Sequence, residues 1–545
     1  LARSAPPDTG GMSWTLSAKA SLSAAKAAGL PFVGSADDIR LEAAYADGAV
    51  TFSGGHARML GADIAAAGLF KDTTIRATLT GALPLPEVTR FLTGRLALPG
   101  HEISGTAETR VDIERAFAEG AATRVSGEMA LHDLWLRLKE KDVVVSAESG
   151  ALRFDIPAEK LSWDFGELRY GDASYNVSGT LAGFRQPHVV ADVDGPAISL
   201  HADAVLEDPQ VVFNECFGRW HDSVFRFKGT WKKEDDTAAI EAEAVVELAD
   251  LAYLPEPAQA AARKVPGRGP CRLSLRLDGP LRRPSLWTVH AKAASDAVRL
   301  AGYYIEDVAI DYEQADRQCR VTQAVFRAYN GEGYGQARVD LTPDIPSFAL
   351  RATLENLDLN RLKIDTPLKG RTFFGILSGN TSLQGTLGEP QTFSGGGHLS
   401  IKDGNLWEFN PMRGLGTFLF IPRFTNIVFD KAQGDYFVRE GHIETQNLQL
   451  IAPELTLLIE GEMEFAGGLD LLVTTQMPLG PAGNVEEVSQ AVGALTKAGS
   501  LTAIHVTGTV QEPKYKLLNA GANIVKKFTD IFSNIFSGPS SNTAP

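Results

Sequence analysis

The residues of this chain that could carry out chemistry are few and widely spaced. Gly331, Gly333 and Gly335 begin like a phosphate-binding loop, but the final glycine of that motif is missing. We therefore expect a turn between β-strands at this position. The ten histidines occur singly, and His398 and His442, for example, have no second ligand at metal-binding spacing. This pattern favours surface histidines over a metal site.

Cysteines and carboxylates give no stronger signal. Cys216, Cys271 and Cys319 form no CxxC pair, which disfavours a zinc ribbon or a disulfide framework. Adjacent acids such as Asp37 and Asp38 face opposite sides of a strand and make poor acid–base pairs. The chain contains no HExxH, Walker, GxSxG or EF-hand motif. We therefore expect a protein that is not an enzyme, with no catalytic residue, metal or cofactor.

Composition excludes further classes. The chain has 545 residues, of which 44% are hydrophobic and 22% charged, values that are ordinary for a folded protein. Its 52 Lys and Arg against 67 Asp and Glu give a net charge of −15, which disfavours nucleic-acid binding. The length corresponds to roughly three or four domains or to a single repetitive body.

The main structural signal is a period of two. Apolar and polar residues alternate along many segments, as they do on a β-strand with one apolar face. Asp47-Gly48, Gly171-Asp172 and Asp403-Gly404 are typical turns between such segments. The apolar set that we expect on one face comprises Leu273, Leu275, Leu277, Leu455, Leu457, Ile459, Met463, Phe465, Leu469, Leu471 and Val473. The pattern predicts an antiparallel sheet with one wet face.

Few segments have a helical pattern that could cover the apolar face. Short candidates lie at 86–93 and 258–263, and a longer one at 485–497. Most of the sheet must therefore pack on a second sheet, curl round on itself, or cover something other than protein.

The pattern of strands and turns also repeats. The segments 28–69, 136–181, 301–341 and 398–465 share an order of alternating strand, turn and strand. A glycine, a Leu or Val two residues on, and a proline recur at 279–284, 385–390 and 508–513. Repetition of this kind is typical of an elongated protein whose units pack on their neighbours.

The C-terminal segment has the stripe of an amphipathic helix. The residues expected on its apolar side, as contacts to a membrane or partner, are Ile524, Phe528, Ile531, Phe532, Ile535 and Phe536. The alternative is a helix that caps the last sheet. No apolar run approaches the roughly 20 residues that span a bilayer. Residues 1–7 lack the regions of a signal peptide, so we expect a processed form or fragment from which an N-terminal anchor or export signal is missing.

The C-terminal third carries an ordered series of short motifs. The series includes Gly395-Gly-Gly-His-Leu-Ser-Ile-Lys-Asp-Gly404, Asp435-Tyr-Phe-Val-Arg439-Glu-Gly441, Gly461-Glu-Met-Glu-Phe465 and His505-Val-Thr-Gly508-Thr-Val-Gln-Glu-Pro513. It resembles the C-terminal region of AsmA-like proteins, which are related to TamB and to the bridge-like lipid transfer proteins. The resemblance covers 351–515; residues 1–350 are similar only in style, as repetitive β-groove units. Residues 516–545 are expected to form the amphipathic helix and a disordered tail.

The resemblance implies a fold and a function. It implies a mainly β protein whose antiparallel sheet curls into a taco-like apolar groove. It further implies a periplasmic location, an N-terminal anchor in the inner membrane and movement of phospholipids toward the outer membrane. The partners would be phospholipid or another acyl lipid, one or both membranes and, as a further candidate, an outer-membrane barrel protein. No catalytic residue is carried over.

Two other functions stay open at this stage. A periplasmic β-rod could assist assembly of outer-membrane proteins, and a β-rich protein could bind or cleave glycans. If lipid moves along the apolar lining, Leu457→Glu or Leu275→Asp is expected to block it and leave the fold largely intact.

Overall fold

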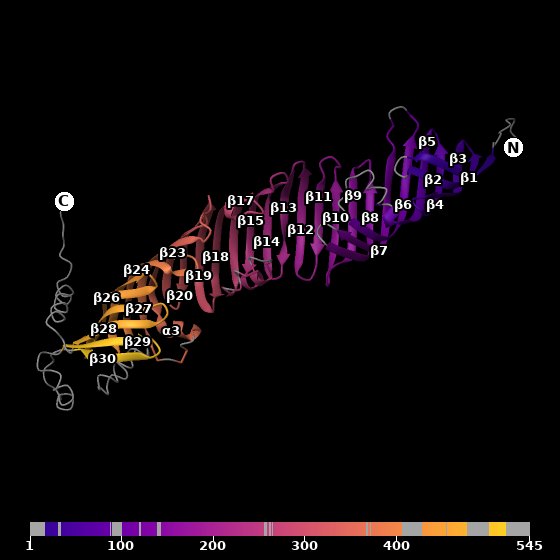
Figure 1. Ribbon diagram of the computed structural model, residues 1–545. Helices are drawn as coiled ribbons and strands as arrows, with labels where there is room; N and C mark the ends of the chain where they lie inside the picture. The colour runs from indigo at the N-terminus through magenta and orange to yellow at the C-terminus, as the bar shows by residue number, and fades with distance from the viewer. Residues whose placement is uncertain are drawn as a thin grey trace, which may run out of the picture. The chain divides into compact units, whose positions relative to one another are not determined.

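The protein is mainly β: of the residues that the structure describes, 77% lie in strands and 6% in helices. The described strands, 30 in number, form one antiparallel sheet that is not closed (Figure 1). These features confirm the fold class expected from the alternation. The computed structural model describes residues 17–30, 34–87, 89, 101–118, 121–138, 143–254, 259–260, 263, 265–366, 369–370, 372–405, 428–453, 455–476 and 501–518.

The chain divides into two compact units, Leu1–Ala242 and Glu243–Pro545, and the boundary falls within β15 (Thr237–Glu247). The other strands of the first unit are β1 (Ala18–Leu30), β2 (Gly34–Ala46), β3 (Ala49–Met59), β4 (Ala62–Lys71), β5 (Thr74–Pro84), β6 (His101–Ala116), β7 (Arg124–Leu138), β8 (Val143–Asp155), β9 (Lys160–Tyr170), β10 (Ala173–Ala182), β11 (His188–Asp194), β12 (Ile198–Glu207), β13 (Gln210–Trp220) and β14 (Ser223–Lys232).

The second unit continues the same meander. Its strands are β16 (Gly267–Arg268), β17 (Pro270–Pro280), β18 (Thr288–Leu300), β19 (Tyr303–Ala315), β20 (Gln318–Ala328), β21 (Gly331–Asp340), β22 (Ser347–Asp358), β23 (Phe374–Thr386), β24 (Glu389–Asn405), β25 (Phe429–Arg439), β26 (His442–Ala452), β27 (Leu455–Glu464), β28 (Gly468–Gln476), β29 (Leu501–Thr509) and β30 (Pro513–Leu518).

Within each unit most strands pair with the next one along the chain; β16 instead pairs with β18, which also pairs with β17. In the first unit, Leu161 of β9 lies opposite Leu181 of β10, which lies opposite Val189 of β11. Register shifts interrupt many of the ladders, for example between Phe52 and Gly55 on β3. Such bulges bend a strand and increase its twist, so the sheet of each unit is not flat.

Two of the predicted turns are confirmed, and a third is wrong. Asp47-Gly48 and Gly171-Asp172 form turns between consecutive strands. Asp403-Gly404 instead lies inside β24, where Asp403 has φ 48° and Gly404 pairs with Phe429 of the next strand. Its geometry is a kink within a long strand, because the chain continues to pair with both neighbours on either side of it.

The glycines at 331–335 were expected to form a turn, and this expectation is wrong. They begin β21, and the preceding turn is made by Tyr329 and Asn330, both at positive φ. A period-two pattern is weak in a glycine-rich segment, because glycine provides no side chain to alternate.

Helices are short in the described residues. They comprise α3 (Leu359–Leu362), the 3-10 turns η1 (Leu248–Tyr253), η2 (Pro284–Leu286) and η3 (Lys363–Asp365), and helical residues at 85–87, 89, 259–260 and 263. The residues at 85–89 and 259–263 lie at or near two of the expected short helices. The expected helix at 485–497 and the C-terminal stripe lie outside the described residues. Within the described part, no helix combines the length and hydropathy needed to span a bilayer.

Candidate functional site

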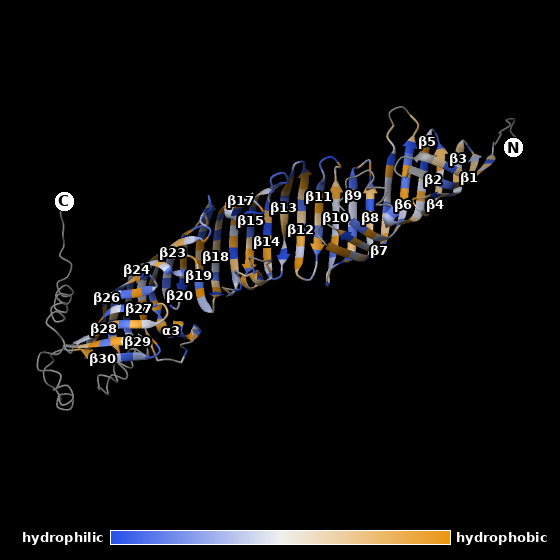
Figure 2. Cartoon of the chain, viewed as in Figure 1, coloured by the Kyte–Doolittle hydropathy of each residue, from blue (hydrophilic) through white to orange (hydrophobic). Residues whose placement is uncertain are grey.

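The two faces of the sheet differ sharply in chemistry. Along β17, Leu273 and Leu275 are half-buried and Leu277 is buried, whereas the side chains between them are exposed. The same alternation runs along most strands, where orange and blue segments follow one another (Figure 2). We call the side that carries Leu273, Leu275 and Leu277, and its equivalent in the first unit, the apolar face. Period-two alternation thus places the site residues without any helix.

The register turns these side chains into continuous rows in the first unit. Directly opposite residues on neighbouring strands lie on the same face, so a chain of partners traces a line across the sheet. One such line crosses twelve strands, β3 to β14, and consists of Gly55, Ala66, Leu79, Val111, Gly127, Phe154, Leu161, Leu181, Val189, Ala204, Phe213 and Gly229. Every member is apolar or glycine. Eleven strand spacings of about 4.8 Å give this row a length of roughly 53 Å, measured along the sheet.

A parallel row runs beside it. It consists of Ala57, Ile64, Gly81, Thr109, Met129, Leu152, Trp163, Gly179, Ala191, Ala202, Cys216 and Phe227. No Lys, Arg, His, Asp or Glu occurs in either row. The apolar face of this unit is therefore a charge-free strip at least two rows wide.

The second unit has equivalent rows. One crosses thirteen strands, β17 to β29, and consists of Leu275, Ala291, Tyr312, Val321, Ala337, Leu350, Leu383, Gly395, Val438, Ile443, Met463, Leu469 and Gly508. The neighbouring row begins at Leu273 and reaches Leu471 and Val506 through equally uncharged partners. Residues almost two hundred positions apart in the sequence thus lie on one line of the sheet.

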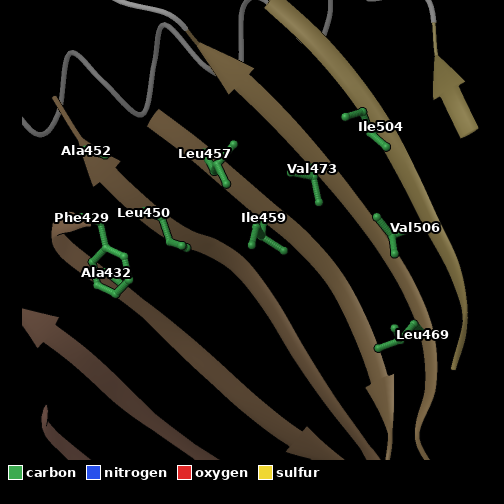
Figure 3. Close-up of a cluster of buried hydrophobic side chains, with 10 residues drawn as sticks. All are labelled: Phe429, Ala432, Leu450, Ala452, Leu457, Ile459, Leu469, Val473, Ile504 and Val506. Atoms are coloured by element: carbon green, nitrogen blue, oxygen red, sulfur yellow. The ribbon is translucent and has the colours of Figure 1, made fainter. Parts of the chain in front are cut away.

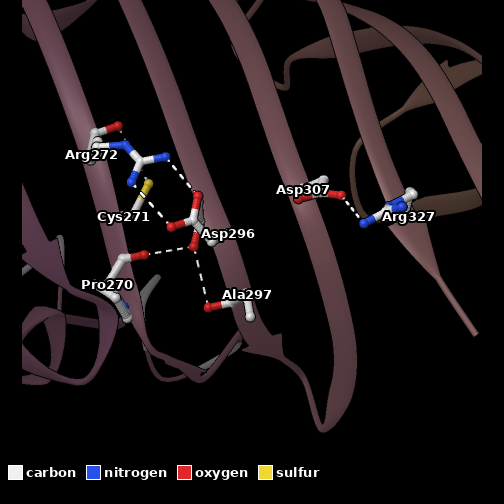
Figure 4. Close-up of polar contacts among 8 residues, drawn as sticks. Pro270, Cys271, Arg272, Asp296, Ala297, Asp307 and Arg327 are labelled. Atoms are coloured by element: carbon white, nitrogen blue, oxygen red, sulfur yellow. Dashed lines mark hydrogen bonds and ion pairs between the residues drawn. The ribbon is translucent and has the colours of Figure 1, made fainter.

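The opposite face carries charges of alternating sign. In the second unit one of its rows runs from Arg276 through His290 and Glu313 to Arg320. Ion pairs link neighbouring strands there, such as Arg272 with Asp296 at 2.8 Å and Arg327 with Asp307 (Figure 4). Both pairs are well exposed, and such pairs add little stability in water. This face is a solvated surface.

Histidines on the wet face pair with carboxylates across strands. The imidazole of His398 lies 2.8 Å from Asp435, and that of His201 lies 2.7 Å from Asp192. The amide of Asn447 and then the imidazole of His398 hold the pKa of Asp435 below its usual value. In the described part of the chain, no three His, Cys, Asp or Glu side chains converge as a metal site.

The apolar face is only partly sealed. Most members of the long rows are half-buried, and Leu399 on the same face of β24 is 44% exposed. Among the described residues, the largest side chains with under 2% exposure are Ile504 and Cys216. A β-sandwich of this size would enclose many fully buried Leu, Ile and Phe side chains between its two sheets. The described strands therefore form a single layer whose apolar face is open over much of its extent.

The face is closed most tightly near the C-terminal strands. A cluster of buried side chains there projects from one side of β25 to β29 (Figure 3). Its members are Phe429, Ala432, Leu450, Ala452, Leu457, Ile459, Leu469, Val473, Ile504 and Val506. Leu458, on the opposite face of β27, is also buried, so this end of the sheet is covered on both sides.

The structure brings most of the predicted lining residues together. Leu457, Ile459, Leu469 and Val473 belong to the buried cluster, and Met463 and Leu471 pack against it. Leu273, Leu275 and Leu277 lie on the same face of the second unit, and Leu273 and Leu275 belong to the two rows described above.

The other predicted lining and contact residues lie at the rim of the face or outside the described part of the chain. Phe465 follows the end of β27, is 42% exposed and contacts the ring of Phe393, so it lies at the rim. Leu455 pairs through its backbone with Ala452, and its side chain lies outside the described part. The C-terminal stripe from Ile524 to Phe536 lies outside the described residues altogether.

Two clusters of hydrogen-bonded polar side chains, which we call polar nodes, interrupt the apolar face of the second unit. The amide of Gln314, which is 8% exposed, donates to the carbonyl of Pro284 at 2.6 Å and accepts from the hydroxyl of Tyr312 at 2.8 Å. These bonds hold the connection between β17 and β18 against β19, next to the apolar face.

The second node fastens the connection that contains α3. The hydroxyl of Tyr329 donates to Asp365 at 2.8 Å, and the guanidinium of Arg299 lies 3.2 Å from the same carboxylate. Leu359 and Phe373 of this connection are buried with Leu357 of β22. The segment therefore covers a part of the apolar face near β22 and β23.

Sequence reasoning missed several members of the site. All three cysteines have neighbours on the apolar face: Cys216 opposite Ala202, Cys319 opposite Gln314, and Cys271 two residues before Leu273 on β17. The aromatic residues Trp163, Phe154 and Phe227 also belong to it. Their alternation with polar neighbours was the available signal, although the rows themselves depend on strand register.

Comparison with known proteins adds no assignment. The sequence matches no protein-family model, and no curated protein matches it.

Proposed function

We propose that this protein binds the acyl chains of lipids along its apolar face and conducts lipids between membranes. The supporting observation is the set of charge-free rows that cross twelve and thirteen consecutive strands, most of whose members are only half-buried. Exposed apolar surface of this extent is unfavourable in water by about 25 cal/mol per Å², so a ligand that covers it gains binding energy. A lipid suits the surface because its chains are apolar and its head group stays in water.

The dimensions of the rows fit several lipids in series. The row of the first unit is roughly 53 Å long, whereas the acyl chains of one leaflet occupy about half of a 30 Å hydrocarbon layer. Movement along such a lining requires no bond to form or break. Each step exchanges one apolar contact for an equivalent one on the next strand, so the protein acts as a conduit and not as an enzyme.

The proposal includes the location that the motif resemblance implies. A conduit of this kind would work in the periplasm, between the inner and the outer membrane, with phospholipid as its cargo. The net charge of −15 gives it no general attraction to nucleic acid.

The unclosed sheet supports a second candidate, an assembly factor. In the described part of the chain, β30 pairs with β29, and the edge of an unclosed sheet is a place where a strand of another protein can add. An outer-membrane barrel protein would offer such a strand. This function predicts a stable protein complex and no transfer of lipid.

A vesicle assay tests the proposed transfer. The purified chain is mixed with donor vesicles of phosphatidylethanolamine and phosphatidylglycerol that carry a fluorescent phospholipid and its quencher, and with unlabelled acceptor vesicles. The expected result is a gain of fluorescence whose rate is proportional to protein concentration. A folded chain that leaves the spontaneous rate unchanged would exclude lipid transfer and favour assembly.

A further inference from the structure

Aromatic rings on the apolar face repeatedly lie over glycines of the neighbouring strand. Five direct cross-strand partners show this arrangement: Phe52 with Gly68, Phe154 with Gly127, Trp163 with Gly179, Phe326 with Gly333 and Phe429 with Gly404. In each pair a Cβ placed on the glycine would come within 2.8 Å of a ring atom. The rings therefore occupy the space that a side chain of the neighbouring residue would need.

This arrangement reduces the height to which the aromatic side chains rise above the sheet. A Cβ on Gly333 would lie 2.1 Å from Cζ of Phe326 and 2.5 Å from both Cε atoms, so the far end of the ring reaches across to the next strand. A side chain that leans across in this way rises less above the sheet than one that stands perpendicular to it. In a β-sandwich, by contrast, inward side chains stand up and interdigitate with the opposite sheet.

Gly333 and Phe326 belong to an uncharged row. The row continues through Leu354, Gly379 and Leu399, and Leu399 leans over Gly379 in the same manner, at 2.8 Å from a Cβ placed there. Gly150 and Phe165 repeat the arrangement in the first unit, with ring atoms at 2.4 and 2.6 Å. The same solution thus recurs in both units, on different strands.

We propose that the glycines beneath these rings set the clearance of the apolar face for an acyl chain. The inference rests on the proposed function and deepens it by naming residues that determine throughput. When the residue beneath the ring is glycine, the ring lies close to the sheet and an acyl chain can pass over it. When that residue has a side chain, the ring is displaced, and because the sheet blocks movement inward, the ring moves outward into the space of the acyl chain.

Strand β21 offers a matched pair of variants. Around Gly333 the nearest atoms to an added Cβ all belong to the ring of Phe326, so Gly333→Ala displaces the ring and leaves the backbone in place. Gly335 lies two residues on, with its partner Ala324 on the same face, and a Cβ there would meet only ordinary contacts at 3.8 Å. Neither glycine has a positive φ. Gly335→Ala is therefore the control for a change of composition alone.

The test measures transfer of the fluorescent phospholipid between the vesicles described above. We expect Gly333→Ala to slow transfer by about tenfold, the effect of an overpacking cost near 1.4 kcal/mol, and Gly335→Ala, which adds a methyl group to the same face without displacing a ring, to slow it much less. The double variant Gly333→Ala with Phe326→Ala should recover, because the displaced ring is absent. Gly150→Ala should repeat the loss in the first unit, and Gly166→Ala, beside Phe165 in open space, should not.

The outcomes separate this inference from the proposed function. If wild-type protein transfers no lipid, the proposed function fails. If wild-type protein transfers lipid and folded Gly333→Ala and Gly150→Ala variants transfer it equally fast, the clearance role is wrong and the function stands. A loss that follows the thermal stability of the variants and is not reversed by Phe326→Ala would also overturn it, because the glycines would then serve folding alone.

Discussion

Leu275→Asp is the most informative single substitution in the apolar face. Leu275 is half-buried on β17, with the small side chain of Ala291 directly opposite. In the free protein an aspartate there keeps contact with water, so we expect a loss of about 1 kcal/mol in the free energy of unfolding. When an acyl chain covers the position, the carboxylate loses its water without a hydrogen-bonding partner.

The magnitude follows from that desolvation. A buried polar group without a partner costs about 1–3 kcal/mol, and a charge costs more. Taking about 3 kcal/mol as a lower bound, transfer past this strand should fall by roughly 150-fold, since 1.4 kcal/mol corresponds to a factor of ten. Leu275→Asn should have a smaller effect, because its amide carries no charge.

The assay is vesicle transfer, with folding checked by circular dichroism and thermal unfolding. Ser274→Asp is the matched control, because Ser274 is exposed on the wet face of the same strand. The reasoning is refuted if folded Leu275→Asp transfers lipid as fast as Ser274→Asp. Leu457→Glu is not an equivalent test. Leu457 is only 2% exposed, so a charge there is expected to disrupt the buried cluster and the fold.

Three further predictions follow from the same geometry. Burial raises the pKa of the Cys271 thiol, and we expect bound phospholipid to slow the modification of this thiol by a maleimide further. A cysteine introduced on the wet face by Ser274→Cys should react at the same rate with and without lipid. Equal protection of both thiols would argue against binding on the apolar face. Tyr329 and then Arg299 hold the pKa of Asp365 below its usual value, so this carboxylate contributes stability above about pH 4 that is lost as the pH falls through the lower pKa of the folded protein. Asp365→Asn should therefore weaken the decrease of the unfolding free energy at acid pH, measured in urea. An unchanged decrease would show that this contact does not contribute. Arg272→Gln breaks an exposed ion pair on the wet face and should leave lipid transfer unchanged, so a large loss would show that this face also carries cargo.

The fold class could be predicted from the sequence because a period of two is a local property. Leu273, Leu275 and Leu277 share a face whatever strand they pair with, and the structure confirms their alternation with exposed neighbours. The rows across the sheet could not be predicted, because they depend on register. Leu275 and Met463 lie on one line only because ten successive pairings have the observed offsets, and each bulge changes an offset by a residue.

Glycine-rich segments carry little information in a period-two pattern. The sequence predicts a turn at Gly333, whereas the structure places this residue inside β21, beneath the ring of Phe326. A local pattern cannot reveal this role, because the aromatic partner lies on another strand. Asp403-Gly404 was misread for the same reason, since Gly404 receives the ring of Phe429. At Gly333 and Gly404, glycine leaves room for a side chain that a neighbouring strand supplies.

Mass spectrometry of small molecules extracted from purified, detergent-free protein tests the central claim most directly. If the apolar face binds acyl chains, the extract should contain several phospholipids per chain, in keeping with rows that each cross twelve or more strands. Leu275→Asp should carry fewer, and Ser274→Asp should carry as many as the wild type. A folded, monomeric sample that contains no lipid would contradict the account and leave an assembly role for the open sheet edge.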